Sequence, residues 1–86
     1  MIKREITIAL DKGLEARPVA VFVQVASQFT SSIIVEYRDK KVNAKSIMGM
    51  MSLGIAQGEK VSVSADGSDE EEAINALKKY LTTKEQ

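Results

Sequence analysis

Hydrophobic and polar residues alternate along several short stretches of the 86-residue chain. In the first stretch the apolar residues share one parity, and they are Ile2, Ile6, Ile8 and Leu10. A period of two is typical of a strand that is buried on one face only. Arg4 breaks the apolar parity close to the chain end, where a long side chain can reach water. Similar patterns rich in β-branched residues predict further strands at 33–37, 40–44 and 60–65.

Two other stretches have the period of a helix. Pro18 fits only the first turn of a helix, and apolar residues then recur at helical spacing, which predicts a helix over 16–28. A second helix is predicted over 69–82, with a buried stripe made of Ala73, Ile74, Leu77, Tyr80 and Leu81. Ser68 and Glu71 have the spacing of a capping box, so Ser68 is the predicted N-cap of this helix.

The element order is therefore β-α-β-β-α-β-α in one domain spanning residues 1–86. This order predicts an α+β fold, an open-faced β-sandwich with a four-stranded antiparallel sheet covered on one face by helices. The strand at 40–44 is short and rich in lysine, which suits a sheet edge, and the first strand is also an edge candidate. Such a layout allows the start of the first helix to lie close to the start of the short helix described next, although periodicity alone does not prove it.

The stretch 45–54 contains three of the four methionines and predicts this short helix. Ser46 is a natural N-cap, and Gly54 is a natural stop because glycine adopts the left-handed conformation at low cost. The helix carries more apolar residues than one narrow face can bury. Ile47, Met48 and Met51 are therefore either partly exposed, forming an adaptable binding surface, or ordinary core residues. The pattern alone leaves both interpretations open.

The composition of the chain excludes several kinds of binding site and activity. Twelve basic residues balance twelve acidic ones, which predicts no direct binding of nucleic acid, and no apolar run approaches the length of a membrane span. The chain has no cysteine and no histidine. It therefore lacks thiolate metal ligands, disulfides and the usual general base, and we expect no metal site, no cofactor, no enzymatic activity and a cytoplasmic location.

Two motifs resemble the HPr family of the sugar phosphotransferase system over nearly the whole chain. They are Gly13-Leu14-Glu15-Ala16-Arg17-Pro18-Val19 and the stretch from Lys45 to Gly54, supported by the Asp69-Glu70 helix start. In this family the first motif carries a phosphorylated histidine. Here Glu15 occupies that place, which implies that the chain is not a histidine phosphocarrier. Glu15 and Arg17 are also read simply as a helix-start carboxylate and a solvated surface charge.

The serine motif resembles that of the Gram-positive members, in which this serine is phosphorylated by HPr kinase/phosphorylase. The Crh branch (catabolite repression HPr) keeps the serine and lacks the histidine, although its usual residue at position 15 is glutamine. The resemblance implies that Ser46 is phosphorylated and that the protein is then a corepressor of catabolite control protein A, a LacI-type repressor. It implies a partner surface formed by Glu15, Arg17, Ala20, Ile47, Met48 and Met51. Ala16 and either Phe22 or Val23 are further candidates for this surface, and the sequence leaves open which of them point outward.

Two alternatives stay open from the residues themselves. Glu15 could accept a phosphoryl group as an acyl phosphate, which would make the protein a working phosphocarrier. Ser46 could instead be only a helix cap in a plain partner-binding domain. The sequence is compatible with a monomer or with a strand-exchanged dimer, because the first strand is an edge candidate followed by a short loop.

Overall fold

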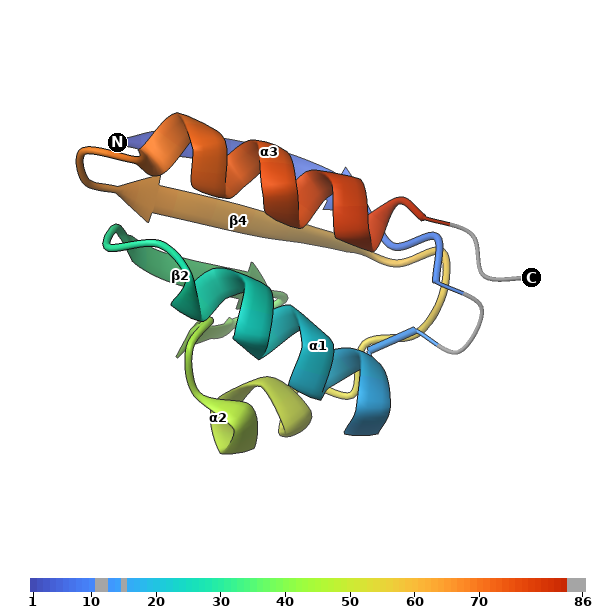
Figure 1. Ribbon diagram of the computed structural model, residues 1–86. Coiled ribbons are helices and arrows are strands. Elements are labelled where there is room, and N and C mark those ends of the chain that lie inside the picture. Colours follow the sequence, from blue (N-terminus) through green and yellow to red (C-terminus); the bar gives the residue numbers. More distant parts are fainter. Residues whose placement is uncertain (11–12, 15, 84–86) are drawn as a thin grey trace.

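The computed structural model of the protein describes residues 1–10, 13–14 and 16–83 (Figure 1). The elements are β1 (Ile2–Thr7), α1 (Ala16–Ser27), β2 (Ser32–Tyr37), β3 (Lys40–Asn43), α2 (Ile47–Met51), β4 (Lys60–Asp66) and α3 (Glu70–Leu81). The four strands form one antiparallel sheet in the order β1-β4-β2-β3. The predicted open-faced α+β sandwich is confirmed, with both β1 and β3 at sheet edges.

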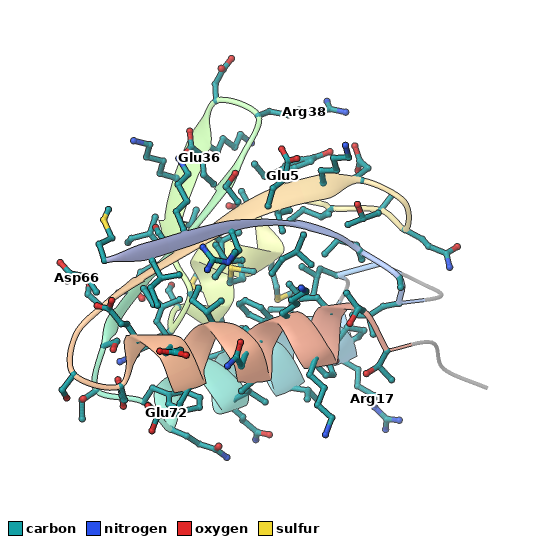
Figure 2. The ribbon with its side chains drawn as sticks, turned by 90° about the horizontal axis from the view of Figure 1, so that it is seen from above. Glu5, Arg17, Glu36, Arg38, Asp66 and Glu72 are labelled. Atoms are coloured by element: carbon teal, nitrogen blue, oxygen red, sulfur yellow. The ribbon has the colours of Figure 1, made fainter. Side chains whose placement is uncertain are left out.

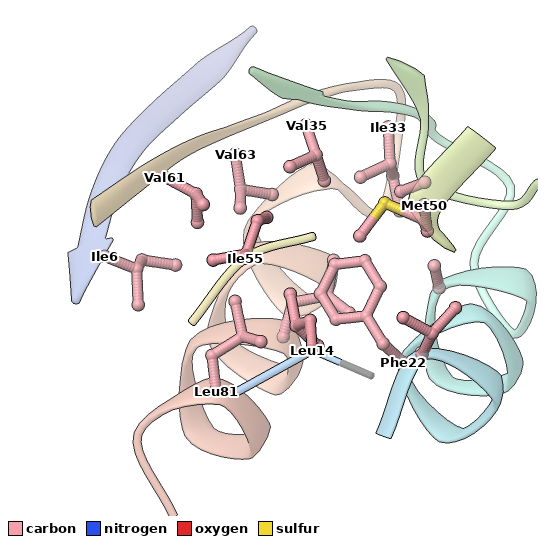
Figure 3. Packing of buried hydrophobic residues seen from close by; sticks show 14 of the residues in the cluster. Ile6, Leu14, Phe22, Ile33, Val35, Met50, Ile55, Val61, Val63 and Leu81 are labelled. Carbon is pink, nitrogen blue, oxygen red and sulfur yellow. The ribbon is translucent and has the colours of Figure 1, made fainter. Parts of the chain in front are cut away.

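One face of the sheet is buried against α1 and α3, as Figure 1 shows. Alternate residues of the central strands point to this face, and the register pairs Ile33 with Ala65 and Val35 with Val63. Phe22 of α1 and Leu81 of α3 pack into the same core (Figure 3). No helix within the described ranges is long and apolar enough to cross a membrane.

The first strand is shorter than its alternating pattern predicts. β1 ends at Thr7, yet Ile8 and Leu10 are buried as expected. Beyond Thr7 the backbone bonds to separate elements, because Ile8 N–H donates to the Glu59 carbonyl and Ala9 N–H donates to the Leu81 carbonyl, both at 2.9 Å. The burial pattern thus extends beyond the strand itself.

The predicted capping box of α3 is wrong. The helix begins at Glu70, whose carboxylate accepts from the Gly67 N–H at 3.1 Å. The preceding Asp69 makes no capping bond with its side chain. Its carboxylate instead accepts from the Thr30 N–H at 2.8 Å, from the Ser31 N–H at 3.0 Å and from the Ser31 hydroxyl. These donors in the α1–β2 loop compete with the local cap.

The suggested proximity of the two helix starts is also wrong. Lys45, just before α2, donates from Nζ to the Phe29 carbonyl at 2.7 Å, two residues after the end of α1. At the other end, Leu14 N–H donates to the Ile55 carbonyl at 2.9 Å. The cause is the β2–β3 hairpin, which returns the chain to the start of β2 and hence to the end of α1. The start of α2 therefore lies beside the end of α1.

Candidate functional site: a serine-capped helix with exposed apolar side chains

Ser46 is the N-cap of α2, as predicted. Its backbone is extended, with φ −106° and ψ 114°, and its hydroxyl oxygen accepts from the Gly49 N–H at 3.1 Å. A Cβ on Gly49 would lie 3.3 Å from the Ser46 hydroxyl oxygen and 3.4 Å from the Val42 Cβ. Glycine at position 49 therefore lets the capped turn approach β3 closely. Ser46 is half-buried, so part of the residue is exposed to solvent.

The helix ends before the glycine that the sequence offered as its stop. Ser52 is the C-cap, and its hydroxyl donates to the Gly49 carbonyl at 2.6 Å. Gly54 adopts a left-handed φ of 59° two residues later, where it redirects the chain rather than ending the helix. α2 is thus a five-residue helix, too short to be stable without its caps and its packing.

The methionine-rich helix is divided between core and surface. Met50 is fully buried and points into the core (Figure 3), which anchors α2 to the rest of the protein. The exposed fractions are 48% for Ile47, 84% for Met48 and 49% for Met51. These three residues are named the α2 patch below. The structure therefore favours the exposed interpretation for all three over the core interpretation.

The other residues predicted for the partner surface are also divided between the surface and the core. Arg17 is exposed in the first turn of α1 and points away from the ribbon (Figure 2). Ala20 is half-buried, while Phe22 and Val23 belong to the core. Phe22 or Val23 as an extension of the surface is therefore wrong, because both side chains are buried in the core. Glu15 and the side chain of Ala16 lie outside the described residues.

Lys45 is a feature of the site that sequence reasoning missed. Its side chain is half-buried, and its ammonium group is bonded to the Phe29 carbonyl near the C-terminal end of α1. Lysines often bind the free carbonyls at helix ends. The signal in the sequence, a lysine directly before a capped helix, does not say which carbonyl it reaches. This bond holds the start of α2 against α1.

A second cluster holds the loop between α2 and β4. The Glu59 carboxylate accepts from the Tyr37 hydroxyl, from Arg38 Nη2 at 3.1 Å and from the Ala56 N–H at 2.8 Å. The Tyr37 hydrogen bond lowers the pKa of Glu59, and the same bond raises the pKa of Tyr37. The Arg38 guanidinium also lies 5.1 Å from the Tyr37 ring centroid. Within the described part of the chain, no group of three or more potential ligands could hold a metal ion.

Fold and surface together define the class of protein: a small open-faced α+β sandwich that presents a serine-capped helix beside exposed apolar side chains. Residues 2–83 match the family model described as the PTS HPr component phosphorylation site. The chain belongs to the HPr family, as the resemblance in the sequence predicted. HPr-family members are phosphocarriers or regulatory proteins.

Particular relatives agree with this placement. The chain is 48% identical over 81 residues to the HPr-like protein Crh of Halalkalibacterium halodurans, covering 94% of this chain and 96% of the relative. A crystal structure of HPr-C-His from Thermoanaerobacter tengcongensis has a TM-score of 0.90 and 58% identity, covering 94% and 91%. The crystal structure of Bacillus subtilis Crh, described as a swapped and intertwined dimer, has a TM-score of 0.75 and 48% identity, covering 94% and 93%.

Proposed function

We propose that the protein is a cytoplasmic regulator of carbon catabolite repression that is switched by phosphorylation of Ser46. In this proposal HPr kinase/phosphorylase modifies Ser46, and the phosphorylated protein binds catabolite control protein A as a corepressor. The observation that carries the proposal is the pairing of a half-buried N-cap serine with the exposed α2 patch. The chain has no histidine, which removes the residue that the family uses for phosphoryl transfer.

The position of Ser46 favours a switch that works through local charge. A phosphate at a helix N-terminus meets free backbone N–H groups, such as that of Gly49, and the positive end of the helix dipole. The modification should therefore hold α2 at least as firmly as the hydroxyl does. The Lys45 ammonium is bonded to the Phe29 carbonyl, an uncharged acceptor, so it keeps its own positive charge beside the modified residue. The phosphate would remain available to basic groups of a partner.

The α2 patch supplies the apolar area that a partner would bury in the proposed contact. Its three side chains project from α2 directly after the modified residue, so a partner that binds the phosphate can cover them at the same time. Charge then distinguishes the two states of the protein, while apolar burial contributes affinity. Arg17 adds a cation at the other end of the α1–α2 pair.

The kinase reaction tests the proposal directly. Purified HPr kinase/phosphorylase and ATP should add one phosphate, detected by intact mass, and Ser46→Ala should abolish its addition. Ser52→Ala is the matched control, because Ser52 is an exposed serine on the same helix with a bonded hydroxyl. Phosphate incorporation that persists in Ser46→Ala, or that disappears in Ser52→Ala instead, would sink the proposal.

The alternative of a working phosphocarrier has its own test. The protein is incubated with phosphoenolpyruvate and the first enzyme of the phosphotransferase system, and its mass is followed. We expect no phosphorylated species, since a phosphoimidazole needs a histidine and the chain has none. A species that forms in the natural protein and is lost in Glu15→Ala would establish the carrier function.

For the assembly we propose a monomer that can also form a strand-exchanged dimer like the one described for Bacillus subtilis Crh. Among the described residues β1 is an edge strand that pairs with β4 alone, so one copy can donate it to another with the same register. Light scattering after chromatography should show monomer and dimer that interconvert slowly. A single monomer peak at every concentration would contradict the dimer.

A further inference from the structure

The outer edge of β1 offers backbone groups that no other strand uses. Ile8 donates to Glu59 and accepts from the Gly58 N–H, the two residues just before β4, so its backbone faces the β4 side of the strand. Because backbone direction alternates along a strand, the groups of Ile2, Arg4 and Ile6 also face β4. Those of Lys3, Glu5 and Thr7 therefore point outward, away from the sheet. Such an edge is a template for another strand unless something blocks it.

Arg4 lies at the middle of this edge. Its side chain has the parity of Ile2 and Ile6, so it stands on the helix-facing side of an edge strand, yet it is exposed. Arg4 Nη1 donates to the Lys3 carbonyl at 3.1 Å. That carbonyl is one of the outward-pointing groups, so the guanidinium occupies an acceptor that an added strand would need.

The same edge is complementary to itself. Two antiparallel copies of β1 related by a two-fold axis at Arg4 would pair Lys3 with the partner's Glu5, and Ile2 with the partner's Ile6. Both residues of the first pair have outward backbone groups, as a hydrogen-bonded pair requires. The axis itself would bring together two copies of Arg4, whose like charges repel.

The charges along α3, the helix that covers β1, would also be complementary between the two copies. α3 covers β1 and β4 in Figure 1, and it carries exposed Glu71 and Glu72 in its first turn and Lys78 and Lys79 in its last. The same two-fold axis would set two α3 helices antiparallel. The acidic end of one helix would then face the basic end of the other.

We propose that the outer edge of β1 is a self-association surface for a second copy of this chain and that Arg4 holds it closed. This arrangement differs from strand exchange, in which β1 replaces the partner's β1 beside β4 and the two β1 edges do not meet. Arg4 acts in two ways: it occupies the Lys3 carbonyl, and it places like charges on the axis.

The test removes the Arg4 guanidinium and measures whether two copies of the chain then associate. Arg4→Val continues the apolar parity of Ile2 and Ile6, and sedimentation should show more dimer than the natural protein forms at each concentration from about 10 μM to 1 mM. Thr7→Val is the matched control, because it adds the same side chain to the same strand and keeps Arg4. Arg4→Thr is a second variant in case valine disturbs folding. Circular dichroism checks the fold of each variant. Folded Arg4→Val and Arg4→Thr proteins that both form no more dimer than the natural protein would overturn the proposal.

Exchanging charges tests the register. One protein combines Arg4→Val with Lys3→Glu, and the other combines Arg4→Val with Glu5→Lys. Each alone places like charges opposite each other, whereas their mixture restores two opposite-charge pairs. The mixture should associate at least about tenfold more tightly than either protein alone. Equal association in all three samples would reject the register and point to strand exchange, in which Lys3 and Glu5 of the two copies do not face each other.

Discussion

Truncation of Met48 tests the proposed binding surface with little effect on the protein core. Met48 is 84% exposed, so Met48→Ala removes few contacts within the free protein. The free energy of unfolding should change by less than about 0.5 kcal/mol, as for an ordinary surface site. The same change should weaken binding of the Ser46-phosphorylated protein to catabolite control protein A.

The size of the binding effect follows from the area that a partner would cover. Full burial of a methionine side chain stabilises an interface by about 1.5–3 kcal/mol relative to exposure. Loss of that burial corresponds to an increase of about 10- to 100-fold in the dissociation constant. Because the lost contact is apolar, the ratio between variant and natural protein should not depend on salt.

Met50 provides the matched variant two residues away. It is fully buried at the other side of the same helix, so Met50→Ala should lower the free energy of unfolding by about 2–5 kcal/mol. Urea denaturation measures the stability of both variants, and isothermal titration calorimetry at two salt concentrations measures their affinity. An unchanged dissociation constant for Met48→Ala, or a stability loss above about 1 kcal/mol, would refute the assignment of Met48 to a partner surface.

Three further changes test the fold around the site. Ser46→Ala should lower stability by about 1 kcal/mol in urea denaturation, since the Gly49 N–H loses its cap acceptor. Gly67→Ala should lower the melting temperature in calorimetry, because its Cβ would lie 2.7 Å from the Ser31 Cα and 2.6 Å from its hydroxyl oxygen. Hydrogen bonds from Ser31 and Thr30 lower the pKa of Asp69 from 3.8 to about 2, so the stability from this ionised carboxylate is present above pH 3.8 and lost as pH falls through 2. Asp69→Asn should therefore be less stable than the natural protein near neutral pH, and thermal unfolding should show this difference shrinking over that range.

The strands were predictable because each has one buried face. Val61, Val63 and Ala65 alternate with polar residues in β4, and that period survives in the structure without change. The Ser46 cap was predictable for a related reason, because its donor, the Gly49 N–H, lies only three residues away. Features that depend on residues close in sequence can be read from the sequence.

The α3 cap and the helix arrangement depend on residues far apart in sequence. Asp69 turns to Thr30 and Ser31, which lie 39 and 38 residues earlier, so no local motif could predict its partners. The position of α2 beside the end of α1 follows from the path of the hairpin rather than from helical periodicity. The same limit applies to the methionines, since a five-residue helix does not show from its period alone that Met50 faces inward and Met48 outward.

The order of charges across the proposed surface follows from the reversed arrangement of the two helices. Ser46 lies near the end of α1, whereas Arg17 lies in its first turn, and the 12 residues of α1 span about 18 Å. That length exceeds the screening distance of about 8–10 Å at physiological salt. We therefore expect a phosphate on Ser46 and the Arg17 guanidinium to be largely screened from each other, each meeting its own counterpart on the partner. Since groups so far apart with no shared contact act independently, the contributions of Arg17 and of the phosphate to binding should add.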